Sequence, residues 1–289
     1  MVSNLKNSKS LFVIADLHVG SSRVSETQLI QAFKFMNELD PEADYIIDGD
    51  LTTSGKRTDF KKVWHFFETL IPNRRNQIIT LGNHDVRGPY SREWSNAKES
   101  SPEYFKKYVS REYRDKYLKK LNLADSEIYF SLKTSSINFV VLNSEKGLKD
   151  AIYLSDKQLM WIENQLQYGK ENDLINILVV HEPLSDTHFR SNENGGFGPQ
   201  DQQLKVILEE FPNTVILSGH IHNGLNKHEA VRKPYGICVD VPGFSVSENG
   251  YIGKGIGYHV KIGKNELNFE SWDFVEKKHL GQFDFKIEF

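Results

Sequence analysis

Short apolar runs alternate with amphipathic stretches of helical period along most of this chain. Residues 11–15 (Leu-Phe-Val-Ile-Ala) are typical of a buried strand, and Leu29 and Phe33 after them share one face of a helix. Such alternation is typical of α/β folds. The pattern predicts further strands at 45–47, 77–81, 139–142, 177–180 and 215–217, and helices at 60–70, 155–166 and 201–210. Ser155 and Gln158 have the spacing of a capping box at the start of one of these helices.

The C-terminal part changes from helical period to a period of two. Tyr258, Val260 and Ile262 alternate with polar residues, and similar alternation recurs over 267–269 and 283–289. We therefore expect a β-rich part at about 230–289, with antiparallel strands and a hairpin turn at Gly263-Lys264-Asn265. Nothing in the composition marks a linker, so residues 1–289 are predicted to form a single domain.

Residues 87–120 form a segment that is rich in aromatic and basic residues. This segment contains 10 Lys or Arg against 5 Asp or Glu, and Tyr104, Tyr108, Tyr113 and Tyr117 fall near helical spacing. We expect one or two helices here, as an insertion at about 88–122. Two interpretations stay open: a basic cap beside a phosphate site, or charged helices whose aromatic stripe packs on the body. The second is favoured.

Composition limits the partners of this protein. A net charge of -3 argues against general affinity for nucleic acid or for an anionic membrane, and the only local basic excess lies at 87–120. No segment has the roughly 20 apolar residues that span a bilayer. The single cysteine, Cys238, excludes an internal disulfide, and residues 11–15 are too short for a signal-peptide core. We expect a cytoplasmic protein without a membrane partner, and nucleic acid is an unlikely ligand.

Side chains that bind metals or carry protons directly follow five of the predicted strands. They are Asp16-Leu17-His18, Gly49-Asp50, Gly82-Asn83-His84-Asp85, His181 and Gly219-His220-Ile221-His222. Each motif has an ordinary alternative as a helix cap, a turn or a hydrogen-bonded histidine. Their shared position decides between these readings, because the carboxyl ends of strands in an α/β sheet converge on one edge.

Spacing within these motifs favours shared ligation. On an extended chain, residues two apart project to the same side, so Asp16 and His18 can meet one metal, as can His220 and His222. Gly49 allows the tight turn that directs the next carboxylate to the same edge. Mixed nitrogen and oxygen ligands suit Mn, Fe, Zn or similar ions.

The ordered set of five motifs resembles the calcineurin-like metallophosphoesterase superfamily, over about residues 11–223. The resemblance implies an α/β (α+β) fold, a four-layer αββα sandwich of two mixed sheets flanked by helices, with the metal site at the carboxyl ends of the strands. It also implies two divalent metal ions. The ligands of the first would be Asp16, His18 and His222, and those of the second Asn83, His181 and His220. Asp50 would bridge the two ions, His84 would be a catalytic imidazole, and Asp85 would orient it.

The resemblance implies hydrolysis of a phosphoester by a metal-bridging hydroxide, with His84 assisting. Residues 49–52 (Gly-Asp-Leu-Thr), together with Leu154-Ser155 and Gln158, are similar to the bacterial cyclic-nucleotide phosphodiesterase-like branch. We therefore favour a small phosphodiester as substrate, with a cyclic nucleotide as one candidate. A phosphomonoesterase or nuclease on the same site is the alternative. A non-catalytic binding module is disfavoured because it predicts missing ligands. The oligomeric state, the native metals and the substrate stay open.

Overall fold

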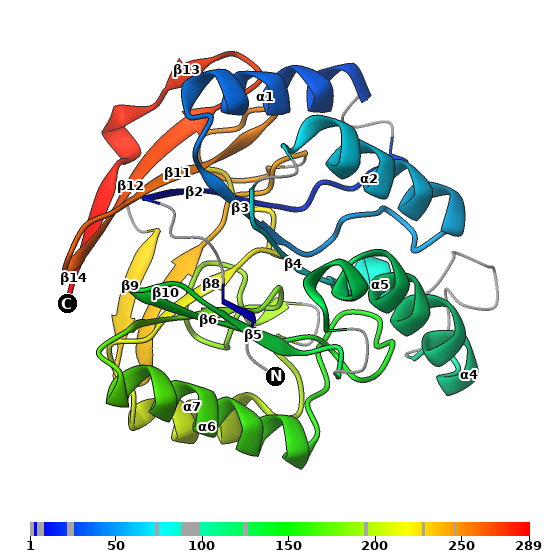
Figure 1. Cartoon of the computed structure of the whole chain (residues 1–289), viewed down its shortest axis with the longest axis vertical. Helices are drawn as coiled ribbons and strands as arrows, with labels where there is room; N and C mark the ends of the chain where they lie inside the picture. The colour runs from blue at the N-terminus through cyan, green and yellow to red at the C-terminus, as the bar shows by residue number, and fades with distance from the viewer. Residues whose placement is uncertain are drawn as a thin grey trace.

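The protein contains two seven-stranded sheets that pack face to face (Figure 1). The computed structural model describes residues 3–4, 9–21, 26–72, 75–87, 99–123, 127–193, 196–226, 229–245 and 247–289. In sheet I the order is β13 (Lys278–His279), β12 (Glu266–Asp273), β11 (Ile256–Ile262), β2 (Ser10–Ala15), β3 (Asp44–Asp48) and β4 (Gln77–Thr80), and β14 (Phe285–Glu288) pairs with β12. In sheet II it is β1 (Ser3–Asn4), β5 (Phe130–Lys133), β6 (Ile137–Val141), β7 (Ile175–Val179), β8 (Val215–Ser218), β10 (Gly236–Asp240) and β9 (Ala230–Lys233).

Both sheets are mixed, and each contains a group of adjacent parallel strands. Strands β2, β3 and β4 run parallel, whereas β11 is antiparallel to β2. In sheet II, β6, β7, β8 and β10 run parallel, β5 is antiparallel to β6 but parallel to β1, and β9 is antiparallel to β10. The parallel strands direct their carboxyl ends to the same side of the molecule.

Helices cover the outer face of each sheet, as Figure 1 shows. Helices α1 (Glu26–Leu39) and α2 (Arg57–Leu70) lie over sheet I, and α6 (Asp156–Glu171) and α7 (Asp201–Glu209) lie over sheet II. The predicted αββα sandwich is therefore confirmed. Among the described helices, none is long and apolar enough to cross a membrane.

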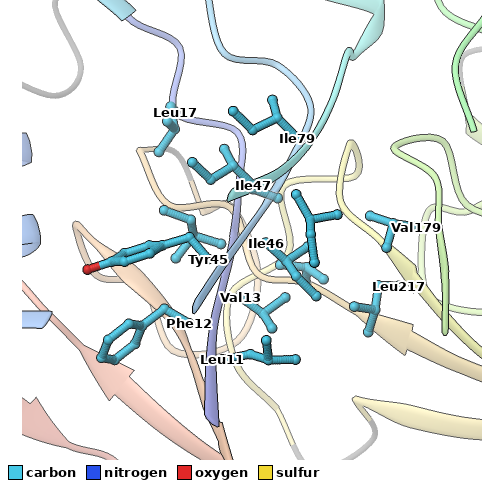
Figure 2. Close-up of a cluster of buried hydrophobic side chains, with 14 of the residues drawn as sticks. Leu11, Phe12, Val13, Leu17, Tyr45, Ile46, Ile47, Ile79, Val179 and Leu217 are labelled. Carbon is cyan, nitrogen blue, oxygen red and sulfur yellow. The ribbon is translucent and has the colours of Figure 1, made fainter. Parts of the chain in front are cut away.

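The core explains why the central strands read as continuous apolar runs. In Figure 2, Val13 and Ile46 of sheet I point toward Leu217 of sheet II, while Phe12 and Tyr45 point to the opposite side. There the Tyr45 ring stacks on a ring from α1, that of Phe33, with centroids 5.9 Å apart. Strands covered on both faces have no polar face, so the alternation of a half-exposed sheet is absent.

The C-terminal part contributes to both sheets. Strands β9 and β10 extend sheet II, whereas β11, β12 and β14 form the predicted antiparallel array in sheet I. The predicted hairpin turn is confirmed by the Gly263 N–H, which donates to the Glu266 carbonyl at 2.9 Å. Because β11 pairs with β2, residues 258–261 lie beside residues 10–13.

Helices occupy the aromatic and basic segment from residue 102 to residue 121. They are α4 (Pro102–Tyr104), a π-helix (Phe105–Ser110), α5 (Arg111–Lys116) and a 3₁₀-helix (Leu118–Leu121). Residues 88–98 of the predicted insertion lie outside the described part. Tyr113 and Tyr117 are buried, and the Tyr117 hydroxyl donates to the Gln77 carbonyl at 2.6 Å. These two tyrosines of the aromatic stripe therefore pack on the body, as the favoured interpretation predicts.

The capping box predicted at α6 is only half formed. The Ser155 hydroxyl accepts the N–H of Gln158 at 3.3 Å. The Gln158 side chain instead donates to the Asn143 carbonyl at 3.0 Å, and Glu145 Oε2 accepts the Ser155 N–H at 2.7 Å. The Glu145 carboxylate, from outside the helix, therefore accepts the N-cap N–H that Gln158 would accept in a complete capping box.

Candidate metal centre

The five sequence motifs meet between the two sheets rather than along the edge of one. Asp16, Asp50 and Asn83 follow β2, β3 and β4 of sheet I. His181 and His220 follow β7 and β8 of sheet II. The carboxyl ends of these two groups of strands lie on the same side of the molecule, so ligands from both sheets enter one site.

The backbone at this site is left-handed at most of the candidate ligands. Positive φ values occur at Asp16 (58°), His18 (45°), Asp50 (46°), His220 (70°) and His222 (52°). The expectation that Asp16 and His18, and likewise His220 and His222, converge on extended chain is therefore wrong. Non-glycine residues rarely adopt this conformation, which costs about 1–3 kcal/mol each and is concentrated at functional sites.

Two glycines allow the motifs to approach closely. Gly49 has φ +70°, and a Cβ there would lie 2.4 Å from the imidazole of His181. A Cβ on Gly82 would lie 2.2 Å from Oδ1 of Asp50. The tight turn predicted at Gly49 is present, and its main effect is to admit a histidine from the other sheet.

One group of ligand atoms is compact. Atoms of Asp16, His18, Asp50 and His222 all lie within 4.8 Å of one another. His222 Nε2 is 3.2 Å from Asp16 Oδ1 and 3.0 Å from His18 Nε2. His18 Nε2 is in turn 3.6 Å from Asp50 Oδ2. This group contains the three residues expected around the first metal, together with the expected bridge.

The remaining candidates lie on the other side of Asp50. Oδ1 of Asp50 is 3.4 Å from His181 Nε2, and the rings of His181 and His220 have centroids 5.4 Å apart. Oδ1 of Asn83 is 3.1 Å from His220 Nδ1. The two oxygens of Asp50 thus approach different histidines, which is the geometry that a bridging carboxylate needs.

Backbone carbonyls orient two of these ligands. Asn83 Nδ2 donates to the Lys149 carbonyl at 2.8 Å, which leaves its oxygen toward His220. His181 Nδ1 donates to the Asp48 carbonyl at 2.7 Å, which leaves Nε2 toward Asp50. Hydrogen bonds of this kind fix the tautomer and the direction of metal ligands.

Buried atoms without a hydrogen-bond partner show that the site fits a cation. They are both carboxylate oxygens of Asp16, Oδ2 of Asp50 and Nε2 of His181. Asp16 and Asp50 have 0% exposure. Carboxylates this deeply buried are strongly destabilising unless they are paired or bind metal. The donor set of carboxylates, imidazoles and a carboxamide oxygen matches the ligands of divalent transition metals.

The pKa values of the histidines at this site reflect both their burial and the negative charge of the buried carboxylates. Burial lowers the pKa of His18 and of His220 to about 3, so both rings are neutral at pH 7 and can ligate. Burial also favours neutral His181, but the charges of Asp50 and Asp16 outweigh it and raise the pKa of His181 well above its ordinary value. A proton on His181 thus balances charge that a bound cation would balance instead.

His84 lies beside the ligands with its side chain 21% exposed. Its Nε2 is 3.9 Å from Asp50 Oδ2. Its Nδ1 is 2.6 Å from the Thr53 carbonyl, which can only accept, and 2.8 Å from Arg87 Nη2, which can only donate. Nδ1 can bond to only one of them at a time, and the choice decides whether Nε2 carries the ring proton. Burial and the charge of Arg87 lower the pKa of His84, against the effect of Asp50.

Asp85, which the resemblance implies orients His84, binds the loop after β3 and the backbone of Gly82. Its Oδ2 accepts the N–H groups of Leu51 and Gly82, both at 3.0 Å. Its Oδ1 accepts the N–H and the hydroxyl of Thr52, both at 2.8 Å. Four donors occupy the carboxylate, so its influence on His84 passes through the loop that presents the Thr53 carbonyl.

Thr53 and Arg87 are site residues that the sequence did not reveal. Arg87 follows His84 by three residues, so helical spacing places both on one side of the turn that begins at Asn83, and that spacing was the available signal. No such signal exists for the Thr53 carbonyl, since backbone atoms have no sequence identity. Its role depends on where the loop after β3 lies.

Comparison with known proteins agrees with this geometry. The family model described as calcineurin-like phosphoesterase matches residues 9–224. No curated protein matches the sequence significantly. A dimetal phosphatase from Danio rerio superposes with a TM-score of 0.65 at 10% identity, covering 98% of this chain and 99% of the other. GAP50, the anchor in the inner membrane complex of Plasmodium, gives 0.59 at 11% identity, covering 96% and 88%. At these identities the likeness shows a shared fold.

Proposed function

Because this chain belongs to the calcineurin-like phosphoesterase family, we propose that it hydrolyses a small phosphodiester at a centre of two divalent cations. Family membership supports a phosphoric ester hydrolase that binds metal. The observation that carries the two-metal proposal is Asp50, a fully buried carboxylate whose oxygens lie 3.6 Å from His18 and 3.4 Å from His181.

The proposed ligands divide about Asp50. Asp16, His18 and His222 would hold one cation, Asn83, His181 and His220 the other, and Asp50 both. Two cations bound in this way would supply Lewis acidity toward phosphoryl oxygens and would bring the pKa of a bound water near neutrality. The carboxylates of Asp16 and Asp50 provide the negative charge, and the neutral imidazoles of His18 and His220 provide lone pairs.

His84 is the proposed proton donor to the leaving oxygen. When Arg87 donates to Nδ1, the ring proton lies on Nε2, which faces the site. When Nδ1 donates to the Thr53 carbonyl instead, a neutral ring has its lone pair on Nε2 and can accept a proton. Proton transfer to the leaving oxygen therefore uses the second arrangement: an imidazolium whose Nδ1 donates to the Thr53 carbonyl gives its Nε2 proton, becomes the neutral ring and can then recover a proton.

Three alternative functions can be compared with this proposal. A phosphomonoesterase would use the same ligands and the same His84, so only substrate comparison separates it from a diesterase. A nuclease would need a broad basic groove, and the chain has net charge -3. The fold shared with GAP50, an anchor, admits a binding module, but here every expected ligand is present.

The deciding experiment combines metal analysis with a substrate panel. Protein reconstituted with Mn²⁺, Fe²⁺ or Zn²⁺ is assayed by elemental analysis and against bis(4-nitrophenyl) phosphate, 4-nitrophenyl phosphate and cyclic nucleotides. We expect two equivalents of metal and faster turnover of the diesters. Protein that binds no metal and hydrolyses none of these esters would contradict the proposal.

A further inference from the structure

Residues 184–193, between β7 and α7, form a loop that its own side chains hold in shape. The Thr187 N–H donates to Ser191 Oγ at 3.2 Å. The Asn192 carboxamide bonds twice to Asp186, accepting its N–H at 2.8 Å and donating to its carboxylate at 2.6 Å. A loop closed by local hydrogen bonds is preorganised, so a ligand would not need to order it.

The tip of this loop, Phe189 and Arg190, contacts the segment that carries His220 and His222. Asn223, which follows His222, donates from Nδ2 to the Phe189 carbonyl at 3.1 Å. Arg190 and His220 line the same small cavity. The backbone of Phe189 is therefore held beside the residue that follows His222, and the next residue, Arg190, shares a cavity with His220.

Ion pairs fix the tip on its other side. Arg190 Nε is 2.9 Å from Glu193, and Nη1 is 2.6 Å from Glu248. Glu248 in turn donates its N–H to the His222 carbonyl at 2.8 Å. Arg190 has φ 72°, a left-handed conformation of the kind that the candidate ligands adopt. Two carboxylates around one guanidinium leave one net negative charge at the tip.

Phe189 projects from this rigid tip into solvent. Its exposure of 67% is the highest among the exposed large apolar side chains of the described part of the chain. A single exposed apolar side chain is ordinary on a protein surface. An exposed aromatic side chain is less ordinary on a loop whose backbone is bonded to the segment of His220 and His222, because a planar group of a ligand could cover the ring without loss of loop entropy.

We propose that Phe189 is a stacking platform for a planar, uncharged group of the phosphoester, an inference that rests on the proposed function. The phosphoryl group would lie at the metal ligands, and an aryl or base-like substituent would lie against the Phe189 ring. The net negative charge contributed by Glu193 and Glu248 disfavours a second phosphate at this position. Phe189 thus selects for an aromatic substituent and against polyphosphate chains.

Phosphonates test the platform without turnover. Calorimetric titration of the Mn²⁺-loaded protein gives the dissociation constants of phenylphosphonate and methylphosphonate. The wild type should bind the phenyl compound more tightly, and Phe189→Ala should reduce the ratio of the two constants by about 3- to 10-fold, the strength of one aromatic contact. Phe189→Trp should restore the ratio. Met160→Ala removes another exposed apolar side chain, on α6, and serves as the matched control with an unchanged ratio.

Two negative outcomes have different meanings. If the wild type hydrolyses bis(4-nitrophenyl) phosphate and Phe189→Ala keeps both its manganese and the wild-type ratio, the platform is overturned while the proposed function stands. If the wild type neither retains manganese nor hydrolyses any ester, the proposed function fails and the platform fails with it. A ratio that falls in Phe189→Ala and recovers in Phe189→Trp supports the platform.

Discussion

The Asp50 carboxylate accepts a hydrogen bond from the backbone N–H of His84, with Oδ1 and N 2.9 Å apart. Asp50 lies in the loop after β3, and His84 lies in the loop and short helix α3 (Asn83–Val86) after the neighbouring parallel strand β4. The candidate bridging ligand and the candidate proton donor are therefore mechanically linked. A displacement of either loop would change both the metal site and the direction of the imidazole.

Asp50→Asn should remove metal from the protein and lower turnover by more than about 100-fold, since the charge shared between the two proposed sites is lost. Elemental analysis and the rate on bis(4-nitrophenyl) phosphate check this. A variant that retains two equivalents of metal and full activity would exclude Asp50 as the bridge.

His84→Ala should lower turnover by about 100- to 10,000-fold, the range expected for loss of a general acid, with metal content unchanged. His65→Ala, which removes an exposed histidine from α2, is the control and should match the wild type in both measurements. Full activity in His84→Ala, with both metals present, would remove His84 from the mechanism.

Asp85→Asn should destabilise the protein by about 2–4 kcal/mol, because an amide group cannot accept all four hydrogen bonds that the carboxylate accepts. Turnover should fall as the Thr53 carbonyl shifts away from His84, while metal content is kept. Urea unfolding and elemental analysis measure the two effects separately. Unchanged stability would show that Asp85 does not hold this loop.

Metal removal should lower thermal stability. Without a cation the carboxylates of Asp16 and Asp50 are buried with unsatisfied oxygens. Restoring metal at 100 times its dissociation constant should stabilise the fold by about 2.7 kcal/mol. Thermal unfolding with chelator and after metal addition measures the shift, and Asp50→Asn should show a smaller one. Equal unfolding temperatures with and without metal would argue against a structural fit to cations.

The free energy of unfolding should fall as pH rises, because of the buried carboxyl group of Glu229. Burial raises the pKa of this carboxyl to about 7, above its ordinary value of 4.5. The folded state therefore holds a proton that the unfolded chain releases, and stability falls from about pH 4.5 to about pH 7, by up to about 3 kcal/mol. Glu229→Gln, which resembles the protonated form, should be more stable than the wild type at pH 8 and equal to it near pH 4.5.

Urea unfolding between pH 4.5 and pH 8 checks this dependence. Glu209→Gln, at an exposed position at the end of α7, is the matched control and should follow the wild-type curve. Parallel curves for the wild type and Glu229→Gln would show that Glu229 is ionised in the folded protein at neutral pH.

Much of the fold could be predicted because it follows from local patterns. The apolar run 11–15, the helical face of α1 and the alternation after Tyr258 are each contained within about a dozen residues, so composition and period identify them. Strand β5 was not predicted, and β9 and β10 were expected only within the β-rich part at about 230–289. These strands are short, and pairing of β5 with β6, of β10 with β8 and of β9 with β10, rather than a pattern of their own, places them in the sheet.

The candidate site, like the fold, could be predicted only in part. The sequence by itself determined which side chains stand at the strand ends and that Asp50 and the histidines could share metals, since ligand chemistry is a property of residue type. Only the tertiary structure decided that two sheets supply the ligands, that the backbone is left-handed at most of them, and that Thr53 and Arg87 contact His84. These relations depend on segments that lie far apart in the chain, such as His181 against Gly49, and on backbone atoms that no residue letter describes.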